Sequence, residues 1–112
     1  MILIEKTPVE GSAIVLIVTF KDFDGADFTP TTCVWSLTDS KGVIINARDR
    51  VSASVVGASH DFVLSGDDLL YAADKGKRVF TVEGTYNSIY GNGLPYREEA
   101  SFACLNSVVD PL

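Results

Sequence analysis

The chain has 112 residues, which is enough for one domain with a single hydrophobic core and excludes a two-domain enzyme. With 46% hydrophobic and 21% charged residues, its composition is typical of a folded globular protein and excludes a disordered one. The net charge is −6, and because phosphate-backbone binding needs a basic face, we expect no nucleic-acid partner.

The N-terminal residues carry no basic region, long apolar run or cleavage site, so we expect no signal peptide and synthesis in a cytoplasm. The longest apolar run, 13–18, is far too short to cross a bilayer, and the acidic charge disfavours anionic membranes; we expect no membrane partner. In such a compartment Cys33 and Cys104 are expected to be reduced.

Apolar residues alternate with a period of two in short runs separated by turn residues, and no long amphipathic helix is present. This pattern predicts about seven strands, at residues 13–21, 31–38, 43–46, 51–56, 60–64, 78–86 and 97–105. Within these strands the alternation predicts core positions for Leu16, Trp35, Leu37, Phe62, Phe80, Val82 and Phe102.

The connections carry recognisable turn chemistry. Asp22–Gly25 and Asp39–Gly42 each end in a glycine that can adopt positive φ, and residues 57–59 join two strands. Ser65 with Asp68 three residues on is a capping-box pattern, which predicts one short helical turn through about residue 73, ended at Gly76. Residues 87–96 form too long a connection for a tight turn, so we expect a loop there.

Together these elements predict an all-β fold, an immunoglobulin-like β-sandwich spanning 1–112 as a single domain. In that topology the strands around Trp35, Phe80 and Phe102 lie side by side in this order. Cys33 and Cys104 would then be separated by a whole strand, beyond the ~7 Å Cα limit for a disulfide, which predicts two free thiols. Gly84 interrupts an inward face, and we expect Trp35 to fill the space beside it.

The acidic residues offer two candidate sites. Asp22, Asp24 and Asp27 surround a glycine and are weak candidates for a calcium site, but they lack the order and the distal glutamate of an EF-hand loop, so a solvated turn is favoured and no metal is expected. Asp67 and Asp68 are better explained as helix-start residues than as a catalytic acid pair.

Nucleophilic catalysis would have to use His60, the only histidine, with Asp61 as its neighbour, and no nucleophile-elbow sequence is present. Gly91-Asn-Gly93 follows a strand without opening a helix, and no phosphate-binding loop exists. Glu98 and Glu99 point to opposite faces of a strand. We therefore expect a protein that is not an enzyme and has no cofactor.

Exposed apolar or aromatic side chains are the remaining candidates for function, because such residues often mark protein contacts. The outward face of strand 13–19 and the expected loop 87–96 predict an interface that contains Val15, Ile17, Ile89, Tyr90, Leu94 and Tyr96. The alternative is that these residues cover sheet edges within the monomer.

Five stretches resemble the small single-domain immunoglobulin-like structural proteins of tailed bacteriophages and prophages: 7–10, 35–39, 42–49, 64–69 and 78–86. The resemblance implies a virion component, a decoration, head-tail or tail-accessory protein, that contacts capsid or tail subunits or packs on itself as a homo-oligomer. It carries over no functional residues. The competing hypothesis is a module that binds a surface glycan through Tyr90 and Tyr96. A hydrolase that uses His60 is the third and least favoured hypothesis.

Overall fold

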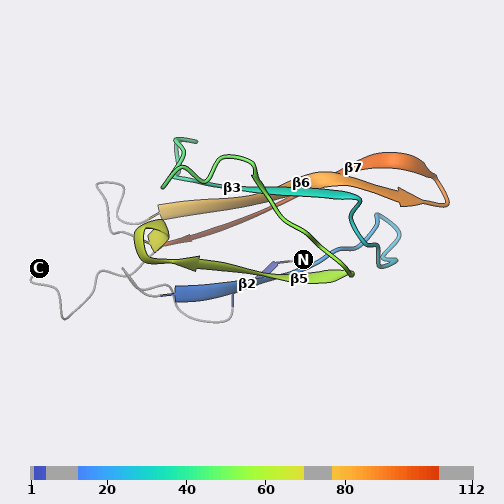
Figure 1. Ribbon diagram of the computed structural model, residues 1–112, viewed down its shortest axis with the longest axis horizontal. Helices are drawn as coiled ribbons and strands as arrows, with labels where there is room; N and C mark the ends of the chain where they lie inside the picture. Colours follow the sequence, from blue (N-terminus) through green and yellow to red (C-terminus); the bar gives the residue numbers. More distant parts are fainter. Residues whose placement is uncertain (1, 5–12, 70–76, 104–112) are drawn as a thin grey trace, which may run out of the picture.

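Seven strands form two antiparallel sheets that face each other in the computed structural model, which describes residues 2–4, 13–69 and 77–103 (Figure 1). One sheet has the order β1-β2-β5 and the other β4-β3-β6-β7. Their bounds are β1 Ile2–Ile4, β2 Ala13–Thr19, β3 Thr32–Thr38, β4 Val51–Ser52, β5 Ser59–Ser65, β6 Lys77–Ser88 and β7 Gly91–Ala103. The predicted all-β sandwich of about seven strands is therefore confirmed, including the neighbouring order β3-β6-β7.

The core lies between the sheets and is built from the alternate residues of each strand. In β2 and β3 every second side chain is buried, as a two-residue period requires. Leu16, Trp35, Leu37, Phe62, Phe80 and Val82 are all buried, as predicted. Phe102 packs against this core but remains partly exposed, because β7 is the edge strand of its sheet.

Two predicted strands are largely irregular. In 43–46 the only ladder contact is a single bridge between Thr38 and Ile44, and β4 covers only the first two residues of the predicted strand 51–56. The chain between them has positive φ at Asn46, Ala47 and Arg50, which interrupts an extended backbone. The inward pattern of 51–56 nevertheless holds, since Val51, Ala53 and Val55 pack against the core.

The predicted loop at 87–96 was wrong. β6 ends at Ser88 and β7 begins at Gly91, so only Ile89 and Tyr90 form the turn. The hairpin projects beyond the end of the other sheet (Figure 1). The glycines that suggested a loop instead allow the irregular start of β7: Gly93 has φ of 66°, and its N–H donates to Asn87 Oδ1 at 2.8 Å.

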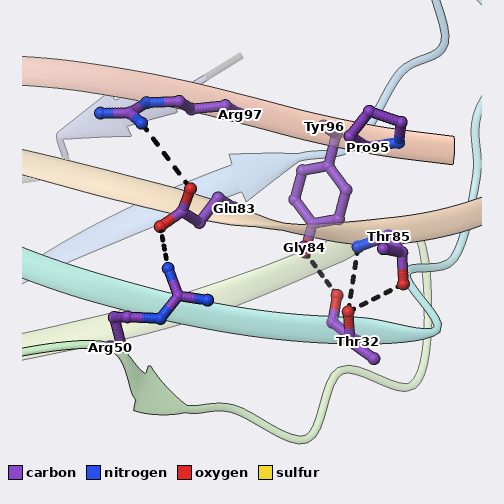
Figure 2. A pocket seen from close by; sticks show the side chains of 8 residues that line it. All are labelled: Thr32, Arg50, Glu83, Gly84, Thr85, Pro95, Tyr96 and Arg97. Atoms are coloured by element: carbon purple, nitrogen blue, oxygen red, sulfur yellow. Dashed lines mark hydrogen bonds and ion pairs between the residues drawn. The ribbon is translucent and has the colours of Figure 1, made fainter.

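The neighbour predicted for Gly84 was also wrong. Gly84 pairs with Cys33 on one side and Tyr96 on the other, whereas Trp35 pairs with Val82. The Tyr96 side chain crosses the glycine and its hydroxyl donates to Thr32 O at 2.9 Å (Figure 2). The missing Cβ therefore makes room for a tyrosine that links β7 to β3.

One of the two hydrogen bonds of the predicted capping box is present at the start of η1, a 3-10 helix at Gly66–Leu69. The Ser65 N–H donates to Asp68 Oδ2 at 3.1 Å, and the same carboxylate is fully buried. It also accepts hydrogen bonds from Asn46 Nδ2 at 2.8 Å and Arg48 Nε at 2.9 Å. The predicted continuation of the turn to residue 73 and its end at Gly76 lie outside the described residues.

Candidate functional surfaces

An apolar surface lies on the outward side of the three-stranded sheet, and we call it the apolar face; it consists of Leu3, Val15, Ile17 and Val63. Cross-strand pairing brings Leu3 beside Ile17 and Val15 beside Val63, and Asp61, which pairs with Ile17, borders this face. Leu3 is 51% and Val63 59% exposed, while the two central residues are partly buried between their neighbours. The predicted outward placement of Val15 and Ile17 is thus observed, and pairing adds two residues that we had not singled out.

A second surface lies at the projecting end of the β6–β7 hairpin, and we call it the tip; it consists of Phe23, Ile89 and Tyr90. Phe23 is 78% and Tyr90 53% exposed, with their ring centroids 4.8 Å apart. The Tyr90 hydroxyl donates to Asp24 Oδ2 at 3.1 Å, which raises the pKa of Tyr90 and fastens the turn at residues 22–25 to the hairpin. Sequence reasoning missed Phe23 because only the fold brings this turn to the hairpin.

Leu94 and Tyr96, also predicted as interface residues, are not freely exposed. Leu94 is partly buried against the core. The Tyr96 ring packs against Phe20 at 5.5 Å and Phe28 at 5.4 Å, and its hydroxyl is held by Thr32. Tyr96 is therefore partly buried and packs against the core, and it does not form one exposed aromatic platform with Tyr90.

The three aspartates of the candidate calcium site each have a protein partner. Asp22 Oδ1 accepts the Tyr86 hydroxyl at 2.9 Å and the Phe23 N–H at 2.7 Å. Asp24 accepts the Tyr90 hydroxyl, and Asp27 pairs with Lys21. Among the described residues no group of three or more His, Cys, Asp or Glu side chains is arranged to hold a metal ion. Asp22 and Asp24 instead fix the turn against the β6–β7 hairpin, and Asp27 pairs within its own connection.

The outward side of the four-stranded sheet carries a row of alternating charges beside an open depression (Figure 2). Arg50 Nη1 lies 2.6 Å from one oxygen of Glu83, and Arg97 lies 3.7 Å from the other. Arg97 also lies 3.6 Å from Glu99. Because these pairs are solvated and internally balanced, they contribute little to stability and leave no net charge for a ligand.

The groups that sequence reasoning considered for nucleophilic chemistry are poorly placed for it. His60 lies on the inward side of β5 with its ring 4.7 Å from that of Phe62, whereas Asp61 points outward on the same strand. Burial raises the pKa of the Cys33 thiol, more than a hydrogen bond with Tyr96 lowers it, so the thiolate is disfavoured. Cys33 is a free thiol, as predicted, and Cys104 lies outside the described residues.

Comparison with family models, curated proteins and solved structures finds no match to this chain. Across the described ranges, no helix has the length and apolar character needed to cross a membrane. A function must therefore be argued from the two exposed surfaces, the apolar face and the tip.

Proposed function

We propose that this protein is a non-enzymatic structural component of a tailed-phage particle, which acts by docking on capsid or tail subunits. The observation that carries the proposal is the apolar face. Exposed apolar side chains on neighbouring strands are typical of surfaces that become buried in a larger assembly.

Two further features support this proposal. The sequence stretches that resemble phage immunoglobulin-like proteins include Leu64–Leu69 and Arg78–Tyr86, which form the end of β5 with η1 and most of β6. The acidic net charge keeps free subunits apart in solution, so association depends on a matching surface rather than on non-specific attraction.

The test is co-sedimentation of the purified protein with particles assembled without it, from the capsid and tail proteins of the same phage. We expect saturable binding that Leu3→Glu weakens at least tenfold, because the charge would lie in the apolar face. Val56→Glu is the matched control, since Val56 is 95% exposed and lies outside that face. Absence of binding by the unaltered protein, or equal binding by both variants, would refute docking through the apolar face.

The tip supports a second candidate function, the binding of a surface glycan. Aromatic rings stack on the apolar faces of sugars, and neighbouring carboxylates accept hydrogen bonds from sugar hydroxyls. Phe23 and Tyr90 provide adjacent rings, with Asp24 beside them.

This alternative predicts binding to oligosaccharides of the host surface, measured by ligand-detected NMR. Phe23→Ala should abolish the signal because it removes the most exposed ring, whereas Ile89→Ser should preserve it because Ile89 supplies no ring. If host oligosaccharides give no signal with the unaltered protein at millimolar concentration, the tip is not a glycan site.

A further inference from the structure

β5 is the longer of the two edge strands of the three-stranded sheet. β5 lies at the end of the order β1-β2-β5, with β2 as its one strand partner in the described ranges. Residues 53–58, which precede it, do not pair with it: the Ala53 N–H donates to Cys33 O in the other sheet, and Ala58 O accepts from the Phe20 N–H. The preceding segment thus crosses between the sheets, and within the described part of the chain no strand pairs with the outer edge of β5.

The register identifies which backbone groups face this edge. The bond from the Phe20 N–H to Ala58 O, at 2.8 Å, continues the antiparallel ladder in which Thr19 pairs with Ser59. Because hydrogen-bonded pairs alternate along such a ladder, residues 60, 62 and 64 bond to β2, and residues 59, 61, 63 and 65 point away from it. The Ser65 N–H confirms this direction, since it donates to Asp68 on the far side from β2.

Ser59, Asp61 and Val63 therefore present N–H and C=O groups at an exposed edge, and all three residues are exposed. Native proteins usually protect such an edge with proline, lysine, a bulge or a covering segment. β5 is a regular seven-residue strand without proline or lysine, and its one outward charge is Asp61. This edge is thus suited to receive another strand.

We propose that β5 pairs antiparallel with β5 of a second copy of this chain, around a two-fold axis that passes beside Phe62. In this register Asp61 lies opposite Val63 of the second copy, and Ser59 lies opposite Ser65 of the second copy. The two three-stranded sheets become one continuous antiparallel sheet.

The sequence of β5 favours this register over its neighbours. An axis at Asp61 would place two carboxylates directly opposite each other, about 5.5 Å apart between Cα atoms, which is destabilising. An axis at Val63 avoids that clash, but Ser59 would then lie beyond the end of β5 of the second copy and would have no residue to pair with. Only with the axis at Phe62 do the two β5 strands pair along their whole length while the two aspartates stay apart.

A second copy fits this edge better than a repeating array does. The opposite edge of the same sheet is β1, which has three residues and offers too short an edge for equivalent pairing. Pairing through β5 therefore uses the longer edge of this sheet in each copy, and because the two-fold axis consumes both edges it closes at a dimer. It also brings the apolar faces of both copies onto one side of the joined sheet, where Val63 of each copy lies near the axis.

The test is the mass of the purified protein by sedimentation equilibrium over a range of concentrations. We expect a reversible dimer, because a single strand pair makes a small interface. Val63→Pro removes the edge N–H and should yield monomer, whereas Val63→Thr keeps that N–H and the β-branched shape and should still dimerise. Circular dichroism checks that both variants fold.

Amide hydrogen exchange of the unaltered protein provides a second measurement, in case Val63→Pro does not fold. The amides of Ser59, Asp61 and Val63 should become protected as the dimer forms, while those of Phe62 and Leu64, which bond to β2, should be protected at every concentration.

A protein that remains monomeric at millimolar concentration would overturn the proposal. So would a dimer in which the amides of Asp61 and Val63 stay unprotected, or one that Val63→Thr disrupts as strongly as Val63→Pro, because the apolar side chain would then be responsible. The proposal does not depend on docking to a particle, which Leu3→Glu tests separately.

Discussion

At the scale of single residues, Trp35 connects the two sheets of the core. Its ring lies 6.3 Å from that of Phe62 on β5 and 5.7 Å from that of Phe80 on β6. On its other side, the Arg48 guanidinium lies 5.6 Å from the ring centroid, within the range of a cation–π contact. Trp35 therefore stabilises both sheets and the irregular segment that carries Arg48.

Trp35→Ala should lower the free energy of unfolding by about 3–5 kcal/mol, because it removes a large buried side chain and leaves a cavity. Urea unfolding followed by far-UV circular dichroism measures this change. A loss of less than about 1 kcal/mol would show that Trp35 does not support the core.

Gly84→Ala should destabilise the protein by about 2 kcal/mol or more, although alanine is the smallest possible replacement. A Cβ at this position would lie 2.1 Å from Thr32 O and 2.9 Å from the Tyr96 hydroxyl, and the first of these is backbone that cannot rotate away. Gly57→Ala is the matched control, since no atom lies within 4 Å of its added Cβ. Equal urea midpoints for the two variants would contradict this account.

At the scale of elements, Asp68 joins three segments that are distant in sequence. Its carboxylate accepts hydrogen bonds from the Ser65 N–H, Asn46 and Arg48, and its backbone oxygen accepts Arg78 Nε at 3.1 Å. Burial alone would raise the pKa of Asp68, but these hydrogen bonds to the charged form outweigh it and hold the pKa below its usual range.

Asp68→Asn should therefore cost about 1–3 kcal/mol at pH 7, where the carboxylate is charged and fully bonded. Because the folded-state pKa lies below the unfolded value of about 3.9, this contribution is complete above that value and is lost as the pH falls through the folded-state pKa. The difference between the unaltered protein and the variant should shrink accordingly in urea titrations between pH 7 and pH 2.

Asp67→Asn is the control for this series, since Asp67 is exposed in the same turn and its replacement should change stability by less than about 0.5 kcal/mol. A stability difference between Asp68→Asn and the unaltered protein that did not depend on pH would show that the charge of Asp68 is not what stabilises the turn.

At the scale of the whole molecule, both sheets share one core, and the longest element, the β6–β7 hairpin, extends past it. Every strand of both sheets contributes side chains that pack in or against this core. The two sheets should therefore not unfold independently.

Unfolding should accordingly be a single cooperative transition. Trp35 fluorescence reports the packing between the sheets, and far-UV circular dichroism reports the strands themselves. At micromolar protein concentration the two urea curves should superimpose. Separate midpoints would indicate that one sheet remains folded without the other.

Local sequence patterns were sufficient to predict the strands that carry the core. The two-residue alternation around Leu16, Trp35 and Phe80 determines which side chains are buried, because successive side chains of a strand must point to opposite faces. The capping pattern of Ser65 and Asp68 was equally local, since both partners lie within one turn. These features depend on neighbours within a few residues, and for that reason the sequence by itself determined them.

The candidate surfaces depend on contacts that no local pattern contains. Phe23 contacts Tyr90, and Tyr96 crosses Gly84 to reach Thr32, because the fold places residues more than sixty positions apart side by side. The open edge of β5 likewise follows from where residues 53–58 cross between the sheets. The tertiary structure alone decided which apolar residues are exposed and which edge is free, since both depend on what the rest of the chain covers.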